Sequence, residues 1–145
     1  MLAQIFEPSS HTIFTWNRAA NLHDRRVYVF GFHVPKQAGT TVADAKTHNL
    51  TTVSFSGEVF IDPDTLDVLE ISSQHDMPAG FPIQVIERRI DYAPQQIAGK
   101  SYSLPSHSQI HMEDGSLIYV NQIDFKNYHR FSSESTIRTV DVAPE

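Results

Sequence analysis

The chain of 145 residues has the length of one domain with one hydrophobic core, so a single domain is expected over residues 1–145. It carries 11 Lys+Arg against 17 Asp+Glu, and the resulting formal net charge of −6 argues against a nucleic-acid-binding protein. It has no cysteine, which excludes disulfides and thiolate sites, and its sequence shows neither a transmembrane segment nor a signal-peptide pattern.

The composition indicates β structure, because β-branched and aromatic residues far outnumber leucine and alanine. No ten-residue segment has helical periodicity, although residues 18–26 could hold one short helical turn. Residues 35–49 have no period and predict a long loop, and Asp62 and Pro63 predict a turn. Strands are expected at residues 11–16, 25–34, 50–61, 66–73, 81–92 and 100–104, followed by a hairpin over 106–126 and a last strand or tail over 132–140.

The hairpin over residues 106–126 has the clearest turn signal, Asp114-Gly115, which is typical of a two-residue turn of the primed type. Pairing across this turn sets Met112 opposite Leu117 and predicts one face more apolar than the other. Sequential strands joined by hairpins predict an all-β antiparallel meander with little helix, as a curved sheet, a sandwich or a barrel.

Several residue clusters resemble a known family. They are FTW at 14–16, RRVYVF at 25–30, GEVFIDPDT at 57–65, MP at 77–78, FPI at 81–83, IDY at 90–92, GKSYSLP at 99–105, NQIDF at 121–125 and FSSESTI at 131–137. Together, over residues 11–140, they resemble the C-terminal domain of uncharacterised secreted or envelope-attached bacterial proteins. That domain is similar to the lipoprotein-carrier (LolA/LolB-like) half-barrel.

The resemblance implies an open, curved half-barrel whose apolar concave face can hold acyl chains, and it implies no named catalytic residues. It suggests the periplasm, the envelope or secretion. Longer members carry an export signal and an N-terminal portion, so the chain is expected to be a truncated form, and its localisation stays open.

The expected ligand-binding residues form an apolar stripe whose default role is the hydrophobic core. Because the expected half-barrel has little helix to cover it, some of the same residues should line a concave pocket. The function expected first is therefore a binding module for an acyl chain or another hydrophobic or amphiphilic small molecule, without a cofactor. The stripe consists of Phe30, Phe32, Ile86, Ile90, Tyr92, Ile110, Met112, Tyr119 and Ile123.

A hydrolase of an acyl ester or lactone is the alternative, with His and Asp side chains brought together from different strands. Eight histidines keep this alternative open, although no motif for a catalytic nucleophile is present and the catalytic residues stay unknown. Calcium or zinc belongs only to this alternative. His107 and His111 lie too far apart on one strand for a single metal ion, and the acidic cluster around Asp62 is interpreted as an ordinary turn.

Charge pairing and sheet edges complete the expectations. Arg88 and Arg89 beside Glu87 are interpreted as cross-strand charge pairs. An open half-barrel has two free edges, so a homodimer through the sheet edges is expected as the formal charge falls toward zero near pH 5–6. The N-terminal strand is expected to be the more exposed edge.

Overall fold

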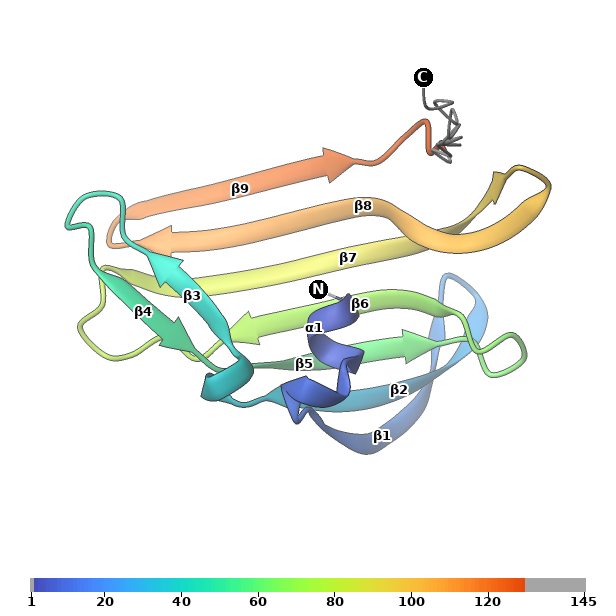
Figure 1. The fold of residues 1–145 in the computed structure, drawn as a ribbon, viewed down its shortest axis with the longest axis horizontal. Helices are drawn as coiled ribbons and strands as arrows, with labels where there is room; N and C mark the ends of the chain where they lie inside the picture. The colour runs from blue at the N-terminus through green and yellow to red at the C-terminus, as the bar shows by residue number, and fades with distance from the viewer. Residues whose placement is uncertain (1, 130–145) are drawn as a thin grey trace, which may run out of the picture.

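Residues 2–129 of the chain are described by the structure, a computed structural model. They form a seven-stranded antiparallel sheet in the order β1-β2-β5-β6-β7-β8-β9, and a separate two-stranded hairpin, β3-β4 (Figure 1). The sheet is neither closed nor strongly curled, and the expected all-β antiparallel fold with little helix is confirmed. The elements are α1 (Leu2–Phe6), η1 (Pro8–Ser10), β1 (Ile13–Leu22), β2 (Arg25–Val34), η2 (Lys36–Ala38), β3 (Thr40–Ala43), β4 (Leu50–Val53), β5 (Phe55–Ile61), β6 (Val68–His75), β7 (Ile83–Ile97), β8 (Lys100–Asp114) and β9 (Leu117–Asp124).

The first hairpin corrects the prediction of a helical turn over residues 18–26. Strand β1 runs on to Leu22, and His23 and Asp24 make the turn to β2 with φ of 48° and 62°. Positive φ at both central residues is the signature of a type I′ turn, whose twist matches that of the flanking strands. The sequence signal was missed because His23-Asp24 lacks the usual glycine.

The segment between β2 and β5 corrects two further predictions. The expected loop over residues 35–49 contains η2 and β3, and the expected strand over 50–61 breaks at Ser54 into β4 and β5. The break has a packing reason, because Val53 and Phe55 on either side of it belong to different apolar clusters. The β3-β4 hairpin therefore leaves the main sheet.

The last hairpin has the predicted pair of strands in a different register. Asp114 pairs with Leu117 and Met112 with Tyr119, so Gly115 and Ser116 are the central turn residues. Gly115 has a φ of 62°, as the first position of a type II′ turn requires. The predicted register was wrong by two residues. Because side chains alternate with a period of two, each kept its predicted face.

Strands β7 and β8 are longer than predicted, and β8 continues through Pro105. A register shift between Asp91 and Tyr92 lies opposite this proline. Proline has no N–H to donate, and a bulge is where a sheet tolerates it. The predicted strand or tail at 132–140 lies outside the described residues.

The two hydrophobic clusters of the core lie on one face of the sheet, while Val27 and Val29 of β2 are fully buried on the opposite face. Ile5 of α1 packs on Phe32, Phe55 and Val59 from the middle of the sheet. The β3-β4 hairpin packs Val42 and Val53 against the end of β7 in a second cluster. Figure 1 shows α1 in front of β5 and β6, with the hairpin lying across one end of the sheet. We call this side the apolar face and the opposite side the polar face.

Candidate functional site

All nine residues of the predicted stripe lie on the apolar face. The strand register shows this directly, because Ile86 pairs with Met112, which in turn pairs with Tyr119. Phe30 pairs with Val59, Val59 with Ile71, and Ile71 with Ile90. The nine side chains therefore share one surface, although they differ in how far they are covered.

Six of the nine belong to the two core clusters or pack against them: Phe30 and Ile90 pack against the main cluster, and the other four lie under the covering elements. Phe32 and Tyr92 lie in the cluster beneath α1, and Ile86 and Met112 pack against the β3-β4 hairpin. Burial raises the pKa of the Tyr92 hydroxyl to about 12. These four residues hold the covering elements in place.

The members other than these four leave part of the apolar face open. Ile90 and Ile110 are half-buried, and Tyr119 and Ile123 are 44% and 39% exposed. We call these four residues, on β7, β8 and β9, the apolar strip. Phe30 lies apart from the strip, next to Trp16 near the opposite edge of the sheet.

Several polar residues share the apolar face with the strip, among them Ser108, which pairs with Ile90 and Ile123, and Asn121, which pairs with Ile110. Two others, Ser73 and Arg88, are adjacent to each other. Ser73 of β6 pairs with Arg88 of β7, and Arg88 pairs with Ile110 of β8. The Ser73 Oγ and the Arg88 Nε are both buried, and neither has a hydrogen-bond partner within residues 2–129. Buried polar groups are nearly always paired, so this adjacent pair of exceptions needs an explanation. Ser73 was not singled out from the sequence, although it shares the face of the buried Ile71.

A buried histidine lies close to these groups. His75 stacks on Phe55 with ring centroids 5.3 Å apart, and its Nδ1 lies 3.4 Å from the carbonyl oxygen of Ile86. Burial lowers the pKa of His75, and the positive charge of Arg88 lowers it further. The neutral imidazole is thus the form that the apolar face favours.

The polar face carries an open cavity of about 660 Å³. Its lining residues lie on β5 to β8 or directly after β6, and most of them carry hydrogen-bonding groups. Gly57, Ser73 and Arg88 contribute to the lining although the strand register places them on the apolar face. It is lined by Ser56, Gly57, Glu58, Ser72, Ser73, Gln74, Asp76, Glu87, Arg88, Arg89, Gln109 and His111.

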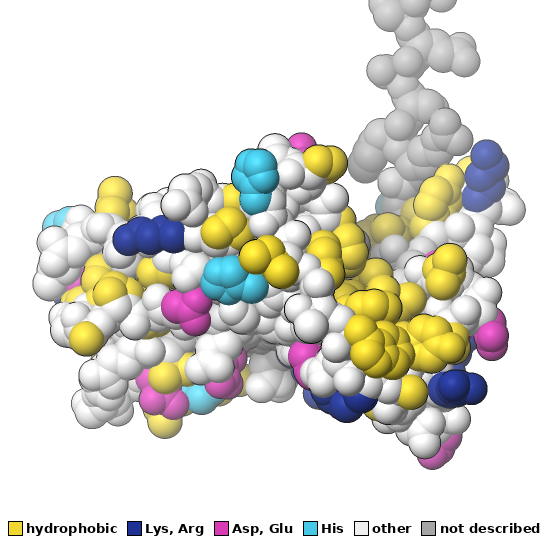
Figure 2. All heavy atoms as spheres, turned by 90° about the horizontal axis from the view of Figure 1, so that it is seen from below, with side chains coloured by type: hydrophobic (Ala, Val, Ile, Leu, Met, Phe, Trp, Pro, Cys, Tyr) yellow, Lys and Arg dark blue, Asp and Glu magenta, His cyan; other side chains and the backbone are white. Residues whose placement is uncertain are grey.

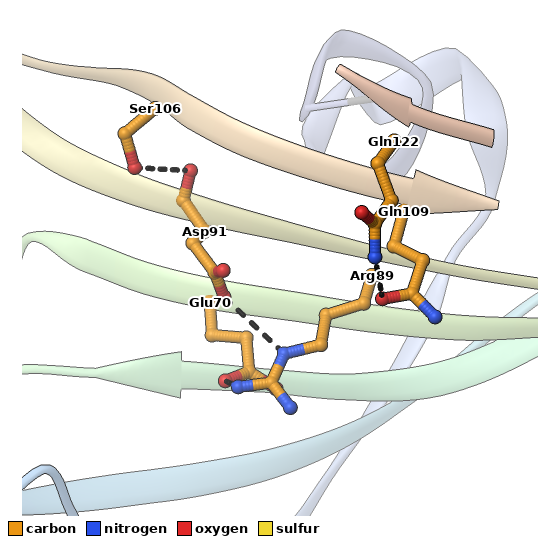
Figure 3. A network of polar contacts seen from close by, with 6 residues as sticks. All are labelled: Glu70, Arg89, Asp91, Ser106, Gln109 and Gln122. Carbon is orange, nitrogen blue, oxygen red and sulfur yellow. Dashed lines mark hydrogen bonds and ion pairs between the residues drawn. The ribbon is translucent and has the colours of Figure 1, made fainter. Parts of the chain in front are cut away.

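Arg89 organises the charged groups of the polar face (Figure 3). Its Nη2 donates to the Oε2 of Glu70 at 2.7 Å, and its Nε donates to the Oδ1 of Asp91 at 3.3 Å. Burial raises the pKa of Glu70, which is 5% exposed, and Arg89 partly offsets that effect. The predicted cross-strand charge pairing is confirmed for Arg89, which pairs with Glu70 of β6. It is wrong for Arg88, which has no ion pair among the described residues.

The polar face also contains a histidine–serine contact and a carboxylate that is bound by an arginine. The His33 Nδ1 lies 2.9 Å from the Ser56 Oγ, which lines the cavity. Glu58 is bound by the guanidinium of Arg18 and the amide of Asn17, and the hydrogen bond from Arg18 holds its pKa below the usual range. The His33–Ser56 contact was missed from the sequence, because it depends on the pairing of β2 with β5 across the inserted β3-β4 hairpin.

The other histidine and acidic groups form local contacts. His107 bonds to Asp124, and His111 lies 3.5 Å from a carboxylate oxygen of Glu87. Asp62 accepts hydrogen bonds from the backbone of the following turn and pairs with Arg25, as an ordinary turn residue does. Within residues 2–129, no group of three or more metal-binding side chains is found.

Aromatic side chains gather near the β1 edge, where Figure 2 shows a patch of hydrophobic groups. Trp16 meets Tyr28 and Phe30 edge-on at 5.3 Å and 5.2 Å between ring centroids, and Phe6 stacks on Phe14 at 5.3 Å. Trp16 stays 53% exposed. The patch attaches α1 and β1 to the end of the apolar face farthest from the strip.

Comparisons with known proteins add no relative to this description. Neither protein-family models, nor curated proteins, nor solved structures give a match to the chain. Across residues 2–129, none of the helices has the length and apolar character needed to cross a membrane. The resemblance to the half-barrel carriers stays a prediction, and function must be inferred from the two faces of the sheet.

Proposed function

We propose that the protein is a binding module that holds an acyl chain, or another hydrophobic or amphiphilic small molecule, on the apolar strip. The single observation that carries this proposal is the position of Ile90, Ile110, Tyr119 and Ile123. They extend the hydrophobic surface of the core across β7 and β8 to the edge strand β9, where Tyr119 and Ile123 are more than a third exposed. Exposed apolar groups that are continuous with a core are typical of ligand sites and interfaces.

The strip can supply binding energy in proportion to the chain that it covers. Each buried methylene contributes about 0.8 kcal/mol. Affinity should therefore rise about fourfold with each added methylene until the strip is filled. Tyr119 suits the outer end of such a site, because its ring is apolar and its hydroxyl can stay in water.

The resemblance to the LolA/LolB-like carriers supports the same proposal. In that family the apolar concave face of an open half-barrel holds acyl chains. Under this proposal the seven-stranded sheet acts as the open half of such a barrel, with α1 and the β3-β4 hairpin as partial covers. The ligand is expected to lie beside these covers, over β7 to β9.

The test is fluorescence displacement of diphenylhexatriene, an uncharged apolar probe, by fatty alcohols of increasing length. Ile110→Glu should abolish displacement, because it puts a charge at the centre of the strip. The matched control is Gln109→Glu, which adds the same charge to the neighbouring residue on the polar face and should leave binding unchanged. Binding that survives Ile110→Glu in a folded variant would contradict the proposal.

Hydrolysis of an acyl ester or lactone is the second candidate, favoured by the 2.9 Å contact between His33 Nδ1 and Ser56 Oγ beside the polar cavity. A histidine base next to a serine can activate the hydroxyl as a nucleophile. Pure protein incubated with acyl esters and acyl-lactones, with and without chelator, tests this candidate. Turnover that disappears in Ser56→Ala would support this candidate. Turnover unaffected by that change would show that Ser56 is not the nucleophile.

A further inference from the structure

We propose that Arg88 and Ser73 form a head-group site on the apolar face, which binds the carboxylate of a fatty-acid-like amphiphile whose chain lies on the apolar strip. This inference rests on the proposed binding function and specifies the class of ligand. It starts from the two adjacent polar groups that the fold leaves without partners.

The surroundings of Arg88 are apolar on nearly every side. Along β7 its neighbours on the same face are Ile86 and Ile90, and across the sheet its partners are Ser73 and Ile110. A guanidinium keeps its charge at all ordinary pH values, so it needs an anion or water to offset burial. No carboxylate of the described residues pairs with it, and its Nε is buried without a hydrogen bond.

Arg89, the next residue, shows how the same side chain behaves when the protein supplies the anions. It points to the opposite face, where its Nη2 donates a hydrogen bond to Glu70 and its Nε donates one to Asp91. The two arginines share one strand and one local backbone. Only their facing differs, and among the described residues only Arg89 has carboxylate partners. We therefore assign the anion that pairs with Arg88 to a ligand.

Ser73 gives the site a second donor. Its side chain is 5% exposed, and its hydroxyl is buried without a partner directly across from Arg88. A buried hydroxyl without a partner destabilises the fold, and a ligand oxygen that accepts its hydrogen bond would offset that cost. A guanidinium edge and a hydroxyl together match the two oxygens of a planar carboxylate.

The position of this pair also sets the direction of the ligand. Ile110 lies next to Arg88, and Asn121 of β9 pairs with Ile110, between Tyr119 and Ile123 along the strand. A carboxylate at Arg88 therefore places the first methylenes over Ile110 and the rest toward β9. The head lies toward the middle of the sheet and the tail toward its edge.

The experiment compares dodecanoate with dodecanol at pH 8 as competitors for diphenylhexatriene, with dodecanoate below its critical micelle concentration and dodecanol below its solubility limit. The two ligands share a chain and differ in head-group charge. A charge-assisted hydrogen bond should make the wild-type protein bind dodecanoate roughly ten- to hundredfold more tightly. Arg88→Met should remove that preference while keeping dodecanol binding, and Ser73→Ala should reduce it in part.

Arg26→Met is the matched control. Arg26 is exposed, lies over the Tyr28 ring near the far end of β2, and its loss changes the net charge by the same amount. This variant should keep the full preference for dodecanoate. Equal binding of the two ligands by wild type, or a preference that survives in folded Arg88→Met, would overturn the head-group site and leave the binding function standing. If neither ligand displaces the probe, the proposed function itself fails.

Discussion

The two faces of the sheet treat the same kinds of side chain in opposite ways. On the polar face, Arg89 is held by Glu70 and Asp91, and Glu58 is held by Arg18. On the apolar face, the hydroxyl of buried Ser73 and the Nε of half-buried Arg88 are buried without a hydrogen-bond partner among the described residues. The polar face thus satisfies its charges from within the chain, whereas the apolar face combines spare hydrophobic surface with spare donors.

This difference is the reason for proposing the ligand site on the apolar face. The polar cavity of about 660 Å³ is lined by Glu58 and Arg89, and both of these charged side chains already have ion-pair partners within the protein. A ligand there would have to compete with existing ion pairs. A ligand on the apolar face would add contacts without breaking any, which favours binding.

The largest contrast between the faces should appear in stability. Phe55→Ala removes a side chain that is 1% exposed in the main core and should lower the free energy of unfolding by about 3–5 kcal/mol. Ser56→Ala, the next residue on the polar face, should cost about 1 kcal/mol through its bond to His33. Urea unfolding of both variants checks this, and equal losses would mean that the polar face carries a core of its own.

The two adjacent arginines should differ next. Arg89→Met leaves Glu70 buried without its partner and should cost about 1–3 kcal/mol at pH 8, while Arg88→Met should change stability by less than about 0.5 kcal/mol. The pKa of Glu70 is already raised by burial, so the protonated carboxyl is the form that the fold tolerates. The cost of Arg89→Met should therefore be absent well below pH 4.5 and grow as the pH rises through the Glu70 pKa. A pH-independent cost in urea titrations would contradict this assignment.

The two faces should also differ, by a smaller amount, in how their contributions to the free energy of unfolding depend on pH. The pKa of His75 is lowered by burial, so its stabilising contribution is present above about pH 6.5 and is lost as the pH falls through its folded-state pKa. The pKa values of Glu58 and Asp62 are also lowered, but their contributions are lost only below about pH 4. His75→Phe should flatten the thermal-stability profile between pH 7 and 5 and leave the acid limb. An unchanged profile would show that His75 does not control this range.

The smallest expected effect concerns the sheet edges. Protonation of all eight histidines moves the formal charge from −6 to +2, so association should grow between pH 8 and 5.5. The sequence favoured the N-terminal edge, but β1 has a register shift beside Arg18, whereas β9 is regular and uncharged from Leu117 to Gln122. Light scattering should show less association for Val120→Lys than for Thr15→Lys, which adds the same charge to β1. The reverse order would place the contact at β1.

The sequence predicted most of the sheet and the membership of its apolar face, for a physical reason. Alternation along β2, β7 and β8 depends only on neighbouring residues, so a register error of two in the last hairpin moved no side chain to the wrong face. The β3-β4 hairpin was not predictable in this way, because Val53 and Phe55 look like one continuous strand until their separate packing partners are known.

The candidate site likewise has a part that the sequence predicted and a part that it did not. The apolar strip was contained in the predicted stripe, because hydrophobic periodicity is visible in the sequence. The partnerless state of Arg88 and Ser73 was not visible, since it depends on which strands pair and on what covers them. The difference between Arg89, which has ion-pair partners, and Arg88, which has none among the described residues, likewise depends on the register of β6 against β7.

The most direct test of the central claim is methyl NMR of isoleucine-labelled protein titrated with dodecanoate. Ile90, Ile110 and Ile123 lie on the apolar face, whereas Ile13 and Ile118 lie on the polar face and are 63% and 67% exposed. The account predicts shift changes that saturate at the first three methyl groups and little change at the last two. Changes confined to Ile13 and Ile118, or uniform changes at all five, would contradict a binding site on the apolar face.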